Sequence, residues 1–541
     1  MTVNAEKHPA IKSFLIQILL VISGAFFFSL ANPGFLFPKG LSLFAWCMYV
    51  PVLLCVHRAS YRTVWLWGGI YGVVSYGLYI FWLFTFSTVA MTAVSFKYFI
   101  LCSLLFIALK AADSLCGKGA AFVQGLTFCA YEYIKTLGFV GFSYGVAGYT
   151  QWKNVLLLQS SALTGVWGIT ALVVFSSVIV YCVVRDAHCP FSAGALWKSV
   201  RHHCAGMCVW TFCLAAALVY GAVVLKTRLP GSGKTVKVCA VQNNSDPWKG
   251  GVEAYERDTK ELMRLTDQAL QTDSDIKLVV WPETAVVPSI IMQYSMRNDR
   301  KRFEIVTSVL KYINRQSAVF VIGNFHSVDS GGEYYDDYNC AFVFKPGVNV
   351  IPPEPELYAK IHLVPFTESF PYGKQFPYVY KLLLKGDTHL WSPGTERKVF
   401  HQAGLSFSVP ICFEDTFGDD CRKFVLNGAR AFINMSNDAW SGSLACQNQH
   451  LAMAVFRSAE NRIPTVRSTA SGQTCIISAA GQITAEAEPF TRTFVTGNIP
   501  VTEPSAPLTL YTRTGDVLGK LFIILAAACF AVCIIWNKKS K

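Results

Sequence analysis

The stretch Ser408-Val-Pro-Ile-Cys412-Phe-Glu414-Asp415 decides how the central part of this chain is interpreted. A short apolar run ends in a cysteine, and acidic side chains follow almost at once. The run is too short for a helix, so a buried strand that ends in a turn is favoured. A cysteine at the carboxyl end of such a strand can act as a nucleophile, although a buried cysteine is more often a small hydrophobic residue. The remaining sequence has to decide between these two interpretations.

The composition of the chain points to a membrane protein with an additional globular part. Its 541 residues are 52% hydrophobic and only 15% charged, and the length predicts more than one domain. The net charge of +13 is compatible with nucleic-acid binding, but no basic block is interleaved with aromatic residues. We therefore expect no nucleic-acid partner and assign the charge to loops that face anionic lipid. The 18 cysteines are scattered and form neither a disulfide framework nor a zinc-type spacing, so no metal is expected.

Eight apolar stretches are each close to the ~20 residues that cross a hydrocarbon core. They cover about 13–31, 41–56, 64–86, 88–109, 119–134, 163–184, 206–225 and 518–536. The first could also be a cleaved signal peptide, but the spans that follow closely favour a retained helix.

The charges of the short loops predict the orientation of these spans. If the amino terminus lies in the cytoplasm, the following basic residues lie there too: Lys7, Lys12, Arg58, Arg62, Lys110, Lys118, Arg185, Lys198, Arg201, Lys538, Lys539 and Lys541. The short outer connections hold only Lys39, Lys135 and Lys153, and Lys97 lies in or beside the fourth span. This asymmetry follows the positive-inside rule and places the large polar segment in the periplasm of a cell with two membranes.

The expected organisation follows from these spans and from the polar segment between them. We expect a membrane domain with seven transmembrane helices over 1–225, a linker over 226–234 and a periplasmic catalytic domain over 235–505. An eighth transmembrane helix over 518–536 and a basic cytoplasmic tail over 537–541 complete it. The outer connections 32–40 and 137–162 are rich in glycine and aromatic residues. They are interpreted either as an aromatic belt or as the floor of a site that takes lipid.

The linker contains a sequence that imitates a nucleotide-binding motif. Gly231-Ser-Gly-Lys-Thr235 resembles the end of a P-loop, but Arg228 stands where that motif needs its first glycine. The motif also needs a preceding strand and a following helix, whereas here a membrane span precedes and a strand follows. A flexible linker is the better interpretation.

The central segment alternates strand and helix patterns. Strands are predicted at Val236–Val241, Ile276–Trp281, Val319–Ile322, Cys340–Phe344, Leu405–Ile411, Ala431–Asn434, Thr465–Ser468, Thr474–Ser478 and Thr493–Ile499. Helices are predicted at Val252–Thr272, Arg302–Arg315 and Cys446–Asn461. This alternation predicts an α/β domain whose helices cover its sheets.

Three strand-end or loop positions of this domain carry chemically suited residues. Glu283 follows the strand that ends in Trp281-Pro, Lys360 and Glu368 flank an apolar loop segment, and Cys412 is the third position. Each alone could be a cap or a solvated side chain. Together, a carboxylate can take the proton of a thiol, and an ammonium can stabilise the oxyanion of a tetrahedral intermediate. The backbone N–H after the cysteine would assist the ammonium.

The same segments resemble a known family. Trp281-Pro-Glu283, Lys360-Ile-His-Leu-Val-Pro-Phe-Thr-Glu368 and Ile411-Cys-Phe-Glu414 are similar to the nitrilase (carbon–nitrogen hydrolase) superfamily. With membrane spans on both flanks, the chain resembles the bacterial apolipoprotein N-acyltransferase family. Ser436-Asn-Asp-Ala-Trp440, Gln449–Arg462 and Arg467-Ser-Thr match further family segments. The resemblance implies a polytopic α-helical membrane domain and an extramembrane α/β domain of the nitrilase αββα sandwich type.

The resemblance also implies roles for individual residues. Glu283 would be the general base, Lys360 the oxyanion-stabilising lysine and Cys412 the nucleophile. Six further residues are implied to support the site or to bind substrate: Glu368, Glu414, Asn339, Trp440, Trp248 and Phe413. The spacing around Trp248 agrees less closely with the family pattern than that of the others. Phe413 replaces the usual tyrosine, Ser441 replaces an aromatic residue, and Thr367-Glu-Ser369 replaces Gly-Glu-Tyr. These departures concern the pocket wall and hence substrate preference.

The implied reaction is a ping-pong acyl transfer without metal or cofactor. Cys412 takes an acyl chain from a membrane phospholipid as a thioester. The α-amino group of the diacylglyceryl-cysteine of an apolipoprotein then accepts that chain. Because both partners are lipids, the protein is expected in the bacterial inner membrane with its pocket facing the outer leaflet.

Three alternatives stay open at this point. His362 lies two residues from Lys360 and could pair with the cysteine in its place. The same three residues could serve a membrane-tethered nitrilase or amidase that hydrolyses a small substrate. A transporter with a soluble receptor domain should carry buried charges within its spans, and these hold almost none apart from Lys97 and Glu132.

Overall fold

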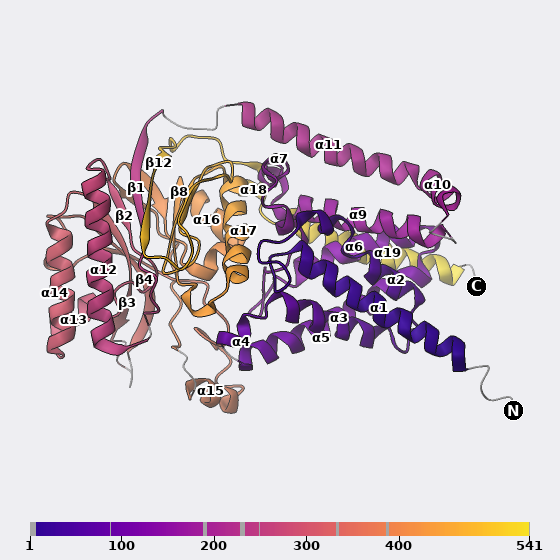
Figure 1. Cartoon of the computed structure of the whole chain (residues 1–541), viewed down its shortest axis with the longest axis horizontal. Coiled ribbons are helices and arrows are strands. Elements are labelled where there is room, and N and C mark those ends of the chain that lie inside the picture. The colour runs from indigo at the N-terminus through magenta and orange to yellow at the C-terminus, as the bar shows by residue number, and fades with distance from the viewer. Residues whose placement is uncertain are drawn as a thin grey trace. The chain divides into compact units, whose positions relative to one another are not determined.

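The computed structural model of the chain describes residues 7–86, 88–187, 192–227, 233–247, 249–329, 331, 335–385 and 389–539 (Figure 1). The chain divides into two compact units. Unit 1 contains Met1–Lys226 and Asp516–Lys541, and unit 2 contains Thr227–Gly515.

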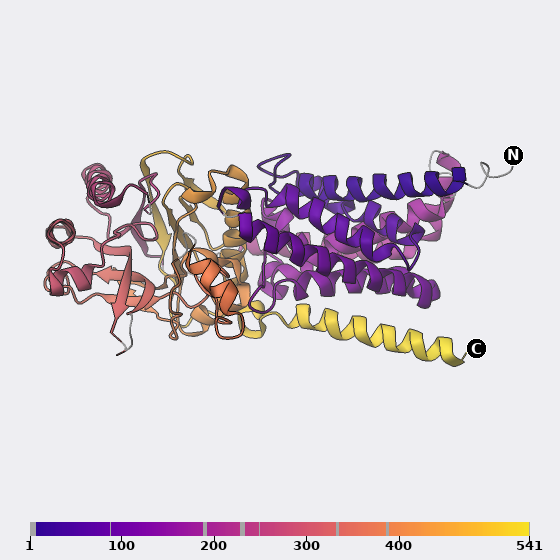
Figure 2. The ribbon, with the colours of Figure 1, turned by 90° about the horizontal axis from the view of Figure 1, so that it is seen from below.

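Unit 1 is built from helices. They are α1 (Lys7–Ala31), α2 (Val50–Arg58), α3 (Val64–Tyr79), α4 (Leu83–Phe86), α5 (Thr88–Leu115), α6 (Ala120–Ile134), α7 (Val155–Leu158), α8 (Ser161–Thr164), α9 (Val166–Asp186), α10 (Ala193–His202), α11 (Cys204–Lys226) and α19 (Val517–Lys539). Three 3₁₀ segments join them: η1 (Ser42–Cys47), η2 (Gly117–Gly119) and η3 (Ala147–Gln151). Figure 2 shows the long helices of this unit running alongside one another.

Five of the described helices are long and apolar enough to cross a membrane. They are Ile11–Ala31, Ala90–Leu115, Val166–Asp186, Cys204–Lys226 and Val517–Lys538. The predicted spans at about 41–56, 64–86 and 119–134 correspond to shorter pieces: η1 with α2, α3 with α4, and α6. The count of eight spans therefore remains a prediction. Helix α10 was not predicted, because it is a short amphipathic helix without the long apolar run by which the spans were identified.

Glycines allow close packing of α3 against α5. A Cβ atom on Gly68 would lie 2.4 Å from the carbonyl oxygen of Cys102, and one on Gly72 would lie 2.3 Å from that of Tyr98. Small residues at such a contact let two helix backbones approach, which favours helix association in lipid.

Unit 1 also contains a buried ion pair near the end of α6. Lys135 Nζ lies 3.0 Å from Glu132 Oε2, and neither side chain is more than 1% exposed. Lys135 donates to the carbonyl of Gly145 at 2.7 Å, and Ala147 N donates to Glu132 at 2.8 Å. The pair therefore fixes the glycine- and aromatic-rich connection that follows α6.

Unit 2 contains two six-stranded sheets. The first has the order β12-β1-β2-β3-β4-β5 and the second β11-β10-β9-β8-β7-β6. Their strands are β1 (Thr235–Gln242), β2 (Leu278–Val280), β3 (Val319–Val328), β4 (Asp336–Phe344), β5 (Glu356–Ala359), β6 (Phe400–Gln402), β7 (Leu405–Ser408), β8 (Ala431–Ser436), β9 (Thr465–Thr469), β10 (Cys475–Ile477), β11 (Ile483–Glu486) and β12 (Thr493–Pro500). Strands β1–β3 pair in parallel, as do β7–β9. The remaining pairings within the two sheets are antiparallel.

Helices flank the two sheets in a four-layer arrangement (Figure 1). They are α12 (Gly251–Thr272), α13 (Ile290–Met296), α14 (Arg300–Asn314), α16 (Gly418–Leu426) and α17 (Leu444–Asn461). The unit also contains the short helices α15 (Pro377–Leu384) and α18 (Leu510–Thr514). Alternate strand residues such as Val238 and Val280 pack with Phe407 and Ile433 of the other sheet. The residues between them along the strand, such as Cys239, face the other side of the sheet and pack with residues of α12 and α14. This period of two matches a sheet buried on both faces.

The predicted α/β character of this segment is confirmed, and each predicted strand and helix has a counterpart. Strands β5, β6 and β11 and helices α13, α15, α16 and α18 were missed. The missed strands have only three or four residues and the missed helices five to nine, which is too short for hydrophobic periodicity to be recognised.

Candidate active site

Strand ends bring the predicted base and lysine together. Glu283 follows β2 and Lys360 follows β5 directly, so the two belong to different strands of the first sheet. Lys360 Nζ lies 3.3 Å from Glu283 Oε1, and the two side chains are 0% and 7% exposed. Two residues 77 positions apart thus form a buried ion pair.

Glu283 is held by hydrogen bonds at both carboxylate oxygens. Asn339 Nδ2 donates to Oε1 at 2.8 Å, and the backbone N–H of Asn437 donates to Oε2 at 3.0 Å. The turn that carries Glu283 lies directly against β3. A Cβ atom on Gly323 would lie 2.4 Å from Pro282 O and from Thr284 N, so only glycine fits there.

Lys360 is charged and shared between two carboxylates. Its Nζ also donates to Glu368 Oε1 at 2.8 Å, and Glu368 Oε2 accepts from the backbone N–H of Val364 at 2.8 Å. Burial acts to lower the pKa of Lys360, but the charges of Glu283 and Glu368 outweigh it and raise that pKa well above its usual value. The ammonium is therefore retained at neutral pH and is available to stabilise an oxyanion.

Cys412 lies on a strained turn that follows strand β7 of the second sheet. After β7, Ile411 forms an isolated bridge with Met435, and Asn434 Nδ2 donates to Pro410 O at 2.9 Å. Cys412 then begins η4 (Cys412–Thr416) with φ = +50°, a left-handed conformation that is costly for a residue with a Cβ atom. Such strain at a predicted nucleophile is consistent with a functional constraint on its direction.

The thiol of Cys412 needs a base to react. Burial raises its pKa well above the ordinary value, the charge of Glu283 raises it further, and the charge of Lys360 opposes this. The resting form at neutral pH is therefore the neutral thiol, so nucleophilic attack requires proton removal by a neighbouring group.

Glu414 joins the lysine loop to the cysteine turn. Its Oε1 accepts from Tyr358 Oη at 2.7 Å and from the backbone N–H groups of Ile361 and His362 at 2.8 and 3.0 Å. Its Oε2 accepts from the N–H of Ile411 at 2.8 Å. Burial nevertheless raises the pKa of this carboxyl against the effect of these donors. We assign Glu414 a structural role, since its carboxylate accepts all four hydrogen bonds from groups of the protein that hold the two loops together.

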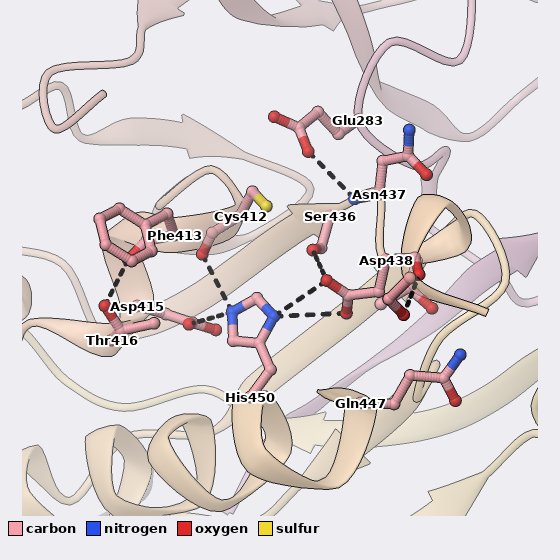
Figure 3. Close-up of polar contacts among 12 residues, drawn as sticks. Glu283, Cys412, Phe413, Asp415, Thr416, Ser436, Asn437, Asp438, Gln447 and His450 are labelled. Carbon is pink, nitrogen blue, oxygen red and sulfur yellow. Dashed lines mark hydrogen bonds and ion pairs between the residues drawn. The ribbon is translucent and has the colours of Figure 1, made fainter. Parts of the chain in front are cut away.

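A buried charged network lies behind the cysteine turn (Figure 3). His450 of α17 contacts Asp415, Asp438 and the carbonyl oxygen of Cys412. Arg467 of β9 forms an ion pair with Asp415 and lies 3.9 Å from Asp438. The sequence signal was present, because a charged residue inside a buried strand and a histidine inside a buried helix both need partners. Their partners could not be identified, since pairing across 12–52 positions is not visible in a local pattern.

The other predicted site residues have different surroundings. Phe413 is buried, with its ring 5.9 Å from His362 and 5.0 Å from Phe417. Trp440 is half-buried in η5 (Ala439–Ser441), on the loop that follows β8. Trp248 lies outside the described residues.

His362 is placed against a different partner from the cysteine. Its Nδ1 lies 3.3 Å from Asp420 Oδ2, and its ring stacks on Phe417 at a centroid distance of 3.9 Å. This geometry favours Lys360 over His362 as the partner of Glu283 and Cys412.

Within the part of the chain that the structure describes, one cluster with potential metal ligands lies in unit 1. The donor atoms of Asp186, His202 and His203 lie within 4.8 Å of one another. Arg185 already donates to both oxygens of Asp186, at 2.6 and 3.1 Å. Because a guanidinium occupies that carboxylate, we assign no metal to the cluster.

Comparison with known proteins covers both units. Residues 237–503 match the Carbon-nitrogen hydrolase family, and residues 23–179 match the Apolipoprotein N-acyltransferase N-terminal domain. Apolipoprotein N-acyltransferase 1 of Treponema pallidum is 41% identical over 95% of this chain and 94% of its own length. Apolipoprotein N-acyltransferase 1 of Treponema denticola is 36% identical over 98% of both chains, and the Geobacter metallireducens enzyme is 27% identical over 93% of both.

Proposed function

The chain belongs to the apolipoprotein N-acyltransferase family, and from this premise we propose that Cys412, Glu283 and Lys360 perform its acyl transfer. The protein is an acyltransferase of lipoprotein maturation. The observation that carries the assignment of residues is the buried Glu283–Lys360 pair, whose charges both act on the thiol of Cys412. A buried group whose pKa is shifted by charged neighbours, as that of Cys412 is here, is typical of catalytic sites.

The first half-reaction would acylate the cysteine. Glu283 takes the proton of the Cys412 thiol, and the thiolate sulfur attacks the ester carbonyl carbon of a membrane phospholipid. The Lys360 ammonium, with the backbone N–H of Phe413, stabilises the negative oxygen of the tetrahedral intermediate. When the C–O bond breaks, Glu283 returns the proton to the leaving oxygen. The products are a lysophospholipid and a thioester on Cys412.

The second half-reaction would transfer the acyl chain to nitrogen. The α-amino group of the diacylglyceryl-cysteine of an apolipoprotein attacks the thioester carbonyl, and Glu283 takes a proton from that nitrogen. The C–S bond breaks, an amide remains on the lipoprotein, and the proton returns to the Cys412 sulfur. One base thus serves both halves, held in place by Asn339 and by the backbone of Asn437.

The supporting residues follow from their contacts. Glu368 would hold the Lys360 ammonium in line with the developing oxyanion, since it accepts from Nζ at 2.8 Å. Phe413 and Trp440 belong to the turn and the loop beside the cysteine and would form part of the wall for the acyl chain. The spans of unit 1 would hold the protein in the inner membrane with unit 2 in the periplasm, where both lipid substrates are within reach.

Mass spectrometry of the purified full-length chain tests the assignment. After incubation with phospholipid vesicles, the Cys412 peptide should gain the mass of an acyl chain, and a diacylglyceryl lipopeptide should remove that mass and become N-acylated. Cys239→Ala is the matched control, because this cysteine is buried in the outer core of the first sheet. Acylation elsewhere, or none, would contradict the assignment of Cys412. Discharge by water without lipopeptide would indicate a hydrolase.

A further inference from the structure

His450 is enclosed by hydrogen-bond acceptors at both ring nitrogens. Nδ1 lies 3.2 and 3.3 Å from the two carboxylate oxygens of Asp438. Nε2 lies 2.7 Å from Asp415 Oδ1 and 3.2 Å from the carbonyl oxygen of Cys412. A carboxylate or carbonyl oxygen can only accept, so both nitrogens have to donate. A histidine that donates from both nitrogens is the charged imidazolium.

The surroundings of His450 support this charged form. The ring is 1% exposed, and two carboxylates face it from η4 and from the loop after β8, with Arg467 of β9 completing the group. The two acids and two bases balance in charge, and the thiols of Cys446 on α17 and of Cys412 are further titratable groups on which the charge of Asp438 acts. Burial acts to lower the pKa of His450, but Asp415 and Asp438 raise it to about 9.

The imidazole connects the two reacting side chains through the backbone. On one side it binds the carbonyl of Cys412, the residue with the strained φ of +50°. On the other side it binds Asp438, which directly follows Asn437. The N–H of Asn437 in turn donates to Glu283 Oε2 at 3.0 Å. Figure 3 shows these contacts, with the ring between the cysteine turn and the Asn437–Asp438 loop.

We infer that His450 is a positioning residue whose imidazolium form sets the distance between the nucleophile Cys412 and the base Glu283. The inference rests on the proposed roles of those two residues. A neutral ring would keep a proton on only one nitrogen, so it would release either the cysteine turn or the Asp438 loop. Acylation should therefore require the charged ring even though His450 touches neither substrate nor thiol.

The decisive variant is His450→Gln, which fills a similar volume but cannot donate to both sides as a cation. We expect the rate constant of Cys412 acylation to fall about 10- to 100-fold, because small displacements of reacting groups have effects of that size. The KM for phospholipid should stay within about twofold, since the ring does not contribute to binding. His401→Gln is the control, because His401 is exposed on β6 and bonds only to Ser406 among the described contacts.

A charge-balanced double variant separates positioning from folding. His450→Gln with Asp438→Asn leaves Asp415 paired with Arg467, so the thermal stability should recover. The acylation rate should stay low, because the link from the Cys412 carbonyl to the Glu283 loop is still lost. Recovery of the rate in the double variant would overturn the inference, as would a wild-type rate in folded His450→Gln.

The wild-type protein offers a test that does not depend on the folding of any variant. Its acylation rate should fall as the pH rises through about 9, where His450 loses its proton. Lys360 should not cause that fall, since its pKa is raised well above its usual value. A rate that keeps rising past pH 10 would contradict the inference. If no thioester forms on wild-type Cys412 at any pH, the proposed nucleophile is wrong and the role of His450 falls with it.

Discussion

Among the described residues, the pair Glu132–Lys135 of unit 1 and the pair Glu283–Lys360 of unit 2 are both buried, and they differ in what surrounds them. Glu132 and Lys135 are three positions apart at the end of one helix, with a separation of 3.0 Å. Glu283 and Lys360 are 77 positions apart on separate strand ends, with a separation of 3.3 Å. The two pairs are therefore similar in burial and in charge, but one joins neighbouring residues of a helix end and the other joins residues from two separate strand ends.

The further contacts of the two pairs explain the difference in role. Glu132 and Lys135 are bound by Tyr49 Oη, Tyr76 Oη, Ala147 N and Gly145 O, all of which belong to unit 1 and hold a loop. The charges of Glu283 and Lys360 also act on a thiol that sits on a strained turn. A buried ion pair alone is thus weak evidence of catalysis, and its convergence on a nucleophile is the informative feature.

The largest expected effect concerns the nucleophile. Cys412→Ala should abolish the acyl-enzyme and all lipopeptide N-acylation, because without the thiol no thioester can form. Mass spectrometry and a lipopeptide acylation assay measure both, with Cys239→Ala as the matched control. Residual N-acylation by the folded variant would show that the acyl chain does not pass through Cys412.

The base should rank next. Glu283→Gln keeps an oxygen to accept from Asn339 or Asn437 but cannot take a proton, so acylation should slow by ~10²- to 10⁴-fold. Quenching the reaction with labelled phospholipid at successive times gives the rate of Cys412 acylation. Glu304→Gln on the exposed face of α14 is the control. A slowing of less than about fivefold would mean that another group removes the proton.

The pair in unit 1 should affect stability and leave the chemistry unchanged. Lys135→Met leaves Glu132 as an unpaired buried charge and should destabilise the protein by about 3–5 kcal/mol. The double variant Glu132→Gln with Lys135→Met should recover most of that loss, as measured by thermal unfolding. If the single variant stays as stable as the wild type but no longer acylates Cys412, the contrast between the two pairs is wrong.

Glu368 should have a smaller effect on the rate. Glu368→Gln removes the negative charge beside the Lys360 ammonium but leaves an oxygen that can accept its hydrogen bond. The loss of transition-state stabilisation should therefore be about 1.5 kcal/mol, or roughly tenfold in acylation rate. Comparison with Glu283→Gln under the same conditions ranks the two acids. Equal losses would mean that Glu368 shares the proton transfer.

The smallest effect is on the reactivity of the resting thiol. Burial and the charge of Glu283 raise the pKa of Cys412, so its alkylation by iodoacetamide should be slow at neutral pH and accelerate as the pH rises. Glu283→Gln removes one cause of the shift and should move the profile to lower pH. A profile in which Cys412 already reacts maximally at neutral pH would contradict a thiol resting state. Cys412→Ser serves as the blank.

Sequence reasoning was strongest where a strand ends in a polar residue. The positions of Glu283 after β2 and of Cys412 after β7 follow from short apolar runs that stop abruptly, whereas strand β5 before Lys360 was not predicted. Such ends are local features, so one chain suffices to find them. The family resemblance added which side chains belong to one site, since spacing alone does not bring residues 77 positions apart together.

Two parts of the structure were not accessible in this way. Hydropathy does not indicate how much of an apolar stretch is continuous helix, so α6 has 15 residues and α3 stops at Tyr79 although apolar residues continue. The network of His450 with Asp415, Asp438 and Arg467 was the other omission. Its members are far apart in the sequence, so the local pattern shows that His450 and Arg467 need partners but does not show which residues these are.

Glu414 has a consequence for how this protein can be altered by recombination. Its single carboxylate accepts hydrogen bonds from the segment after β5 and from the turn after β7, so the two loops are held together by one side chain. An exchange of either loop with that of a distant relative, or a one-residue insertion in one of them, would separate the donors from this carboxylate. The two loops therefore have to be transplanted as a pair, together with Tyr358, if a chimera is to keep its lysine opposite its cysteine.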